Sequence, residues 1–118
     1  MNIVKLEEGS TYQPEAGWKR VSLAGSDQVS IEYFEKPKGH TSPLHQHINE
    51  QVCIVIRGKM KVVNGVGEEA ILRVGDSAWF APDEPHRVEN AGEELAAGID
   101  IFAPGRSFDF WLKQLKKT

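Results

Sequence analysis

Short runs of apolar and β-branched residues, separated by glycine, proline and aspartate, recur along most of the chain. Turn residues at these intervals end each run before a helix could form, so the pattern predicts β-strands. The predicted strands cover residues 29–35, 45–57, 59–63, 70–74, 78–81, 86–89 and 95–103. Between them almost no segment spaces its apolar residues with a helical period. The spacing is typical of an all-β domain, either a sandwich or a barrel.

The C-terminal segment departs from this pattern. Its apolar residues recur at i, i+3, i+4 and i+7, which is the spacing of one face of a helix. They are Phe108, Trp111, Leu112 and Leu115. Ser107 stands just before them and can serve as the N-cap. We therefore expect a short C-terminal helix that covers one mouth or edge of the barrel.

The run of residues 52–56 is apolar at every position. Because side chains alternate between the two faces of a strand, both faces of this strand must be covered. The inner face packs in the core, whereas the outer face needs another sheet of the same chain or a second subunit. We expect a second subunit, and therefore a homodimer that forms through the outer face.

Composition and charge narrow the class of protein. The 118 residues suffice for one domain, and 40% hydrophobic and 26% charged residues are ordinary for a globular chain. A formal net charge of −3 gives a nucleic-acid partner little electrostatic support. No segment approaches about 18 consecutive apolar residues, so no membrane-spanning helix is expected. The first ten residues do not resemble a signal peptide and Cys53 is the single cysteine, so we expect a cytoplasmic protein.

Three of the four histidines lie in two short segments that can meet inside a barrel. His45 and His47 are two residues apart, so an extended chain points both side chains to one face. Gln51 lies a further four residues along and therefore shares this face, whereas Glu50 points to the opposite face. His86 follows a proline-rich turn and begins a later strand. The inward side chains can therefore converge on one point.

A His-x-His pair on its own is more often a surface or capping feature. Here several polar side chains would face a barrel interior, which is costly unless a ligand or water satisfies them. We therefore interpret the set as a metal site, with His45, His47, Gln51 and His86 as ligands. Imidazole and amide ligands suit zinc, nickel, iron or manganese. A bulge in the strand would make Glu50 the fourth ligand instead.

These residues resemble the two motifs of the cupin family. The first motif, at residues 39–58, reads Gly39-x5-His45-x-His47-x3-Gln51-x6-Gly58, with glutamine where glutamate is usual. The second, at residues 75–90, reads Gly75-x5-Ala81-x-Asp83-x2-His86-x3-Asn90. Asp83 replaces a glycine there, a mild change because aspartate tolerates left-handed backbone geometry better than most residues.

The resemblance implies a single cupin domain over residues 1–118. Its fold would be a double-stranded β-helix, the cupin jelly-roll barrel, with the metal between its two sheets. His40 lies outside the ligand pattern and is expected on an exposed loop. Cys53 shares the inward parity and is expected to be a small core residue rather than a ligand.

The last predicted strand adds a second group of candidate residues. Alternation puts Asp100 and Phe102 on one face, where the small residues Ala96 and Gly98 leave room for a ligand. Composition alone is equally consistent with a solvated outer face for Asp100 and a surface position for Arg106.

The run Asp100-x-Phe102-x-Pro104-x-Arg106 and the earlier His-x-His-x2-Glu-Gln are similar to those of small cupins of pectin and alginate breakdown. Members of that group linearise unsaturated uronates. The resemblance implies an isomerase-type enzyme whose small-molecule substrate is a 4,5-unsaturated uronate monosaccharide. It further implies that Asp100 is the acid/base or orienting carboxylate, that Arg106 binds the substrate carboxylate and that Phe102 packs against the sugar.

Two other functions remain open. Three-histidine sites host oxygen chemistry in other cupins, so a metal-dependent dioxygenase or other oxidoreductase is the first alternative. A non-catalytic module that binds a sugar or an anion is the second. Against the oxygenase, the neutral ligand Gln51 leaves the full charge of a bound dication in place, which favours Lewis-acid chemistry.

Overall fold

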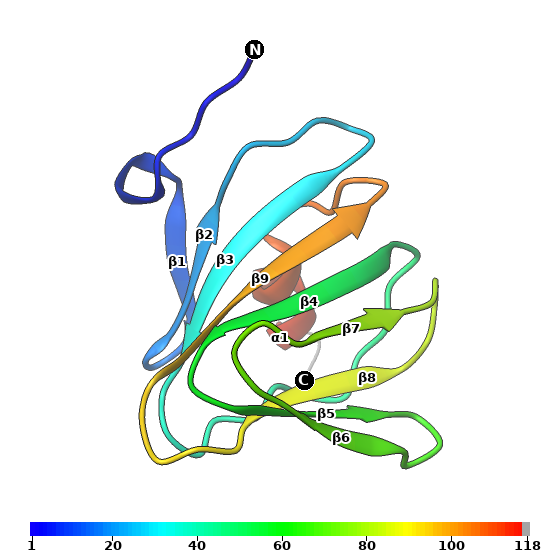
Figure 1. The fold of residues 1–118 in the computed structure, drawn as a ribbon. Coiled ribbons are helices and arrows are strands. Elements are labelled where there is room, and N and C mark those ends of the chain that lie inside the picture. The colour runs from blue at the N-terminus through cyan, green and yellow to red at the C-terminus, as the bar shows by residue number, and fades with distance from the viewer. Residues whose placement is uncertain (117–118) are drawn as a thin grey trace.

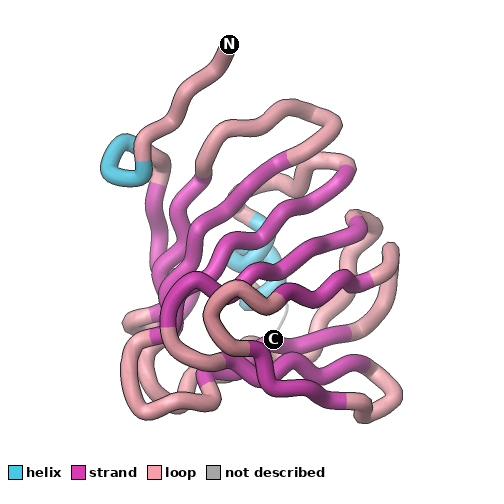
Figure 2. Tube along the Cα trace, viewed as in Figure 1, coloured by secondary structure: helices cyan, strands magenta, loops and turns pink. Residues whose placement is uncertain are grey.

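The computed structural model describes residues 1–116, and in that range it contains nine β-strands in two sheets (Figure 1). The strands are β1 Thr11–Glu15, β2 Trp18–Ser22, β3 Ser30–Lys36, β4 Glu50–Arg57, β5 Met60–Asn64, β6 Glu69–Leu72, β7 Ser77–Phe80, β8 His86–Asn90 and β9 Ala96–Ala103. A 3₁₀ turn, η1 (Leu6–Glu8), precedes them and one helix, α1 (Phe110–Leu115), follows them. Strands make up most of the barrel wall, and loops join them at the two ends of the barrel (Figure 2).

The larger sheet has the strand order β1-β2-β3-β9-β4-β7, and the smaller has the order β6-β5-β8. Every pairing between neighbouring strands is antiparallel. The two sheets face each other across the core (Figure 1). This arrangement is the jelly-roll barrel predicted from the sequence, so the fold prediction is confirmed.

The histidine segment is extended without being a strand. The strand predicted from residue 45 begins at Glu50, and His45 forms only an isolated bridge with His86. The carbonyl of His47 accepts instead from the backbone N–H of Asp83, at 2.8 Å, so the segment is bonded to a loop. Exposed and buried residues nevertheless alternate from Leu44 to Gln51, so the parity argument holds.

The loop that leads into β8 contains the one non-glycine residue with positive φ among those described. Asp83 has φ of 61°, which lies in the left-handed region. Its backbone geometry is therefore the one expected of a residue that stands in place of a glycine.

The sequence pattern missed β1 and β2 altogether. β1 carries Pro14 and alternates exposed with half-buried residues, which gives it no apolar face. β2 turns a charged residue, Arg20, toward the interior beside the fully buried Trp18. Neither strand therefore has the regular apolar alternation that marks a strand in sequence.

The core lies between the inner faces of the two sheets. Cys53 is fully buried there in a cluster that includes Phe34 and Met60. The room expected above Gly98 is absent, because the Phe34 ring fills it and a Cβ on Gly98 would lie 2.6 Å from Phe34 Cζ. That part of the prediction is wrong, since Phe34 comes from a neighbouring strand that the local pattern does not reveal.

The outer face of the larger sheet is apolar and partly exposed. Val52 pairs with Trp79 of β7 on one side and with Ile101 of β9 on the other, and Ile54 pairs with Ile99. The four residues of β4 and β9 are half-buried, whereas Trp79 of β7 is 58% exposed. No other sheet among the described residues covers this face.

The C-terminal helix is present but differs in detail from the prediction. It begins at Phe110, with Asp109 rather than Ser107 in the N-cap position, and the Ser107 hydroxyl donates to the Asp109 carboxylate. Trp111 is buried as expected, but Leu112 is exposed. In Figure 1, α1 lies behind β9 and β4, on the inner side of the sheet. No helix among residues 1–116 is long and apolar enough to cross a membrane.

Candidate metal centre

Three histidines from two segments meet inside the barrel. The backbones of His45 and His86 exchange two hydrogen bonds, of 3.0 and 2.9 Å, which place the two side chains next to each other. His47 lies two residues further along the same extended segment. One ring nitrogen from each of the three lies within 4.8 Å of the others. All three side chains are at least nine-tenths buried.

The backbone fixes the tautomer of each ring. Nδ1 of His45 lies 2.9 Å from the carbonyl of Pro43, and Nδ1 of His86 lies 2.8 Å from that of Glu84. Nδ1 of His47 likewise lies 3.0 Å from a backbone carbonyl, that of Asn49. A carbonyl only accepts, so each neutral ring carries its proton on Nδ1 and leaves a lone pair on Nε2. Hydrogen bonds of this kind commonly orient histidines that bind metals.

Burial keeps these rings neutral. It lowers the pKa of His45 to about 2, with help from the neighbouring His86. Burial and the nearby Arg106 lower the pKa of His47 to about 4. Burial also lowers the pKa of His86. Near pH 7 the three imidazoles are therefore in the form that binds a metal.

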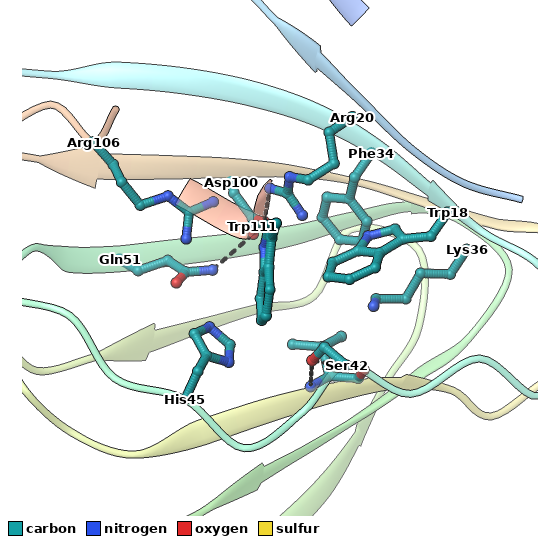
Figure 3. A pocket seen from close by; sticks show the side chains of 11 residues that line it. Trp18, Arg20, Phe34, Lys36, Ser42, His45, Gln51, Asp100, Arg106 and Trp111 are labelled. Atoms are coloured by element: carbon teal, nitrogen blue, oxygen red, sulfur yellow. Dashed lines mark hydrogen bonds and ion pairs between the residues drawn. The ribbon is translucent and has the colours of Figure 1, made fainter. Parts of the chain in front are cut away.

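Gln51 completes the group. Its Oε1 lies 3.1 Å from Nε2 of His47 and 3.1 Å from Nε2 of His86. Its Nε2 donates to Oδ1 of Asp100 at 2.9 Å, which fixes the orientation of the amide because a carboxylate only accepts (Figure 3). The oxygen thus faces two nitrogens that carry lone pairs, and no proton lies between them.

Acceptors that face one another without protons repel, and a bound cation would relieve that repulsion. Ligand atoms about 2.1 Å from a tetrahedral metal lie roughly 3.4 Å apart, close to the separation between the Gln51 oxygen and the two imidazole nitrogens. The three nitrogens and the amide oxygen therefore fit a divalent transition metal. Each of these four side chains is neutral, so the group would add no negative charge to a bound ion.

Glu50 lies outside this group. It is exposed on the opposite face of β4, and its Oε1 accepts from Trp79 Nε1 at 2.9 Å. No bulge turns it inward, because β4 and β7 stay in register from Gln51 to Ile54. The structure therefore places Gln51, not Glu50, beside the histidines.

Asp100 faces the interior, which rules out the solvated outer face that composition alone left open. It is 4% exposed, and its Oδ2 accepts from Arg20 Nη2 at 2.7 Å. Arg20 also donates through Nε to Glu32 at 2.6 Å. Glu32 pairs directly opposite Asp100 across β3 and β9, so one guanidinium bridges two adjacent carboxylates. Both oxygens of Asp100 are therefore engaged, by Arg20 and by Gln51.

Arg106 is buried as well, which rules out the surface position that composition alone left open. Its Nη2 donates to Glu32 at 3.2 Å, and Nε has no partner among the described residues. The guanidinium carbon lies 3.9 Å from the ring centroid of Phe102 and 4.3 Å from that of Phe110. Phe102 itself is fully buried beneath Arg106, so in this structure it presents no free face to a sugar.

Sequence reasoning missed three charged residues of the interior, Arg20, Glu32 and Lys36, which are at most 3% exposed. In β3 the apolar residues Ile31 and Tyr33 suggest that the odd positions face the core, but the structure turns the even positions inward. One signal in the sequence could have revealed them. Glu32 and Lys36 stand two residues before and after Phe34, so a strand that turns Phe34 into the core turns them inward as well.

His40 was expected on an exposed loop, and that expectation is wrong. Its side chain is only 11% exposed, and its ring packs 4.7 Å from that of Trp18. Nε2 lies 3.0 Å from Oε1 of Glu15, and Nδ1 lies 3.1 Å from Nζ of Lys36. His40 therefore links the buried amine to the surface of the barrel.

A cavity of about 20 Å³, enough for about one water, lies beside the histidines. Figure 3 shows Lys36 and Arg20 on one side of it and Gln51 and His45 on the other. Helix α1 closes the site, because the Trp111 ring packs 4.4 Å from His45 and 4.7 Å from Trp18. A ligand larger than water must therefore displace the Trp111 side chain.

A family model for the cupin domain matches residues 32–102, which include both histidine segments and nearly all of β9. The chain belongs to the cupin family. No protein of curated function matches this cupin.

Solved structures agree with this cupin fold over most of the chain. An RmlC-like cupin from Shewanella frigidimarina has 24% sequence identity and a TM-score of 0.81, over 93% of this chain and 96% of its own. KdgF from Halomonas sp. has 22% identity and a TM-score of 0.82, over 93% and 98%. TT1209 from Thermus thermophilus has 25% identity and a TM-score of 0.74, over 90% and 100%.

Proposed function

We propose that this cupin binds a divalent transition metal through His45, His47, Gln51 and His86, and that it catalyses ring opening of a 4,5-unsaturated uronate. The observation that carries the metal site is the set of lone pairs that converge without a proton between them. The substrate class rests on the run from Asp100 to Arg106, which is similar to that of the uronate-linearising cupins.

The metal, when bound, supplies Lewis-acid polarisation of substrate oxygens. The residues of the chain supply the rest. Asp100 holds the Gln51 amide with its oxygen toward the histidines, and the same carboxylate lines the cavity, where it can receive a proton from a substrate hydroxyl. The aromatic side chains of α1 exclude water from this reaction.

Arg106 has a narrower role than the family resemblance implies. Glu32 already pairs with its guanidinium, and the rings of Phe102 and Phe110 both pack against it. The Nε–H group remains as one buried donor without a partner among the described residues. We propose that Arg106 gives this hydrogen bond to the substrate, and that Phe102 supports Arg106 from beneath.

The test follows unsaturated galacturonate by NMR in the presence of metal-loaded protein, metal-stripped protein and no protein. The blank is needed because this sugar also opens slowly unaided. We expect metal-dependent acceleration above the blank. No acceleration by protein of verified metal content would refute the uronate activity. Oxygen uptake by the iron-loaded protein, measured in parallel, would instead favour the oxygenase.

We also propose that two copies of the chain pair through the outer face of the larger sheet. The support is the continuous apolar surface that Val52, Ile54, Ile99, Ile101 and Trp79 form there. Light scattering should give twice the chain mass for the wild-type protein and for the exposed-loop control Val66→Lys. Ile54→Lys should give the mass of one chain, and an unchanged dimer would refute this interface.

A further inference from the structure

Lys36 is a buried amine that the proposed reaction does not use. It ends β3 with 1% exposure, and its Nζ lies 4.2 Å from the centroid of the Trp18 ring. Its one hydrogen bond goes to Nδ1 of His40, at 3.1 Å, although an ammonium has three donors. Among the described residues Lys36 forms no ion pair.

The other charges of the interior are already matched. Arg20 is paired with Asp100 and Glu32, and Arg106 is paired with Glu32. Arg20 and Arg106 thus share the two carboxylates, and Lys36 is a third basic group that has none. Placing a charge in a protein interior is costly unless a counter-charge is present. The cavity that Lys36 shares with His45 and Gln51 is where such a counter-charge can lie.

We propose that this cavity is a carboxylate-binding site in which Lys36 is the recognising cation. A ligand held at the three histidines, with the Trp111 side chain displaced, would place its carboxylate against Lys36, in the space between Trp18, Ser42 and Gln51. The inference rests on the proposed function in one respect, because it names the residue that recognises the uronate carboxylate at the same site. It makes Lys36, not Arg106, the main determinant of preference for an acidic sugar.

The surroundings of Lys36 support this role. Burial and the nearby Arg20 lower the pKa of Lys36 to about 7, against weaker opposing effects of Asp100, Cys53 and Glu15. The free site thus holds the amine partly unprotonated at neutral pH, and a bound carboxylate would favour the ammonium. His40 connects Nζ to the surface carboxylate of Glu15, so the proton taken up on binding has a hydrogen-bonded route.

The experiment compares binding of D-galacturonate and D-galactose, which differ by the carboxylate, to metal-stripped and metal-loaded protein by NMR titration. Wild type should bind galacturonate more tightly than galactose, and Lys36→Met should reduce that preference at least tenfold in both metal states. Lys38→Met is the matched control, because Lys38 is 64% exposed on the same turn and is paired with Glu93. Its preference should equal that of wild type.

A second readout uses pH. Galacturonate affinity of the wild type should fall as the pH rises above 7, and this fall should be absent in Lys36→Met. Methionine is close in length to lysine and suits the face of Trp18; Lys36→Gln is the alternative if the methionine variant does not fold. Both variants are checked by thermal unfolding and metal content.

A folded Lys36 variant that keeps the wild-type preference and pH profile would overturn the proposal. The result is separable from the test of the reaction. Lys36-dependent binding without ring opening would refute the uronate activity and support the carboxylate-binding site. Ring opening with unchanged binding in Lys36→Met would support the uronate activity and refute the carboxylate-binding site.

Discussion

Asp100→Asn separates two roles for Asp100, proton transfer and orientation of Gln51. In the wild type, one carboxylate oxygen accepts from Arg20 at 2.7 Å and the other accepts from Gln51 at 2.9 Å. Asparagine offers one oxygen and one NH₂ group in the same space. The oxygen should face Arg20, because a hydrogen bond to a charged group is the stronger of the two. The NH₂ group then faces the Gln51 NH₂, and two donors repel.

Rotation of the Gln51 amide relieves this conflict. Its oxygen turns toward the NH₂ group of the introduced asparagine, and its own NH₂ turns toward Nε2 of His47 and His86, where it donates to the lone pairs that a metal would use. The variant therefore no longer offers the Gln51 oxygen to a metal. The lone pairs of His47 and His86 are occupied by hydrogen bonds from the Gln51 NH₂ group. Changes to groups that orient metal ligands typically cost about 10- to 100-fold in affinity, or about 1.4 to 2.8 kcal/mol. We expect a loss of this size.

The assay is a competition titration of zinc against a chromophoric chelator. Glu32→Gln is the matched control, because it also removes a carboxylate from Arg20 but does not contact Gln51. Both variants break a buried ion pair and should lose about 3 kcal/mol of unfolding free energy. Only Asp100→Asn should lose metal affinity. Wild-type zinc affinity in that variant would show that Asp100 does not orient Gln51, and would leave proton transfer as its role.

Three further predictions concern the fold and its pH dependence. The histidine pKa values are lowered in the folded state, so their contribution to the stability of metal-free protein should be full above about pH 6.5. It should fall by about 1.4 kcal/mol per pH unit per histidine below that pH; equal urea midpoints at pH 7 and pH 5 would contradict this. Trp111→Ala should lose about 3–5 kcal/mol and speed zinc removal by EDTA, with the exposed Leu112→Ala as an unaffected control. Gly98→Ala should lose about 1–3 kcal/mol in a thermal or urea melt because its methyl group meets Phe34, whereas an unchanged melt would show that the ring can yield.

The grouping of the three histidines with Gln51 could be predicted because its signal is local. His45, His47 and Gln51 lie in one extended segment, and alternation places them on one face whether or not the segment pairs as a strand. His86 follows at a spacing that the second motif fixes. The terminal helix was likewise readable from its period, although its first residue and its buried face were not.

The charged interior could not be predicted from the same pattern. Alternation tells which residues of β3 share a face, but not which face is inside, and Ile31 and Tyr33 suggested the wrong one. That choice depends on β9 and β2, whose residues pair with β3 from distant parts of the chain.

The sequence by itself determined the strand-rich fold, the parity of each extended segment and the residues that meet at the candidate metal centre, because these depend on short-range spacing. Only the tertiary structure decided which cations already have carboxylate partners, which space a phenylalanine fills and which side chains close the site. Arg106 is committed to Glu32, and Lys36 is left without a carboxylate among the described residues. Such partnerships join strands that are far apart in sequence, and the free energy of a buried charge depends on those partners rather than on its neighbours along the chain.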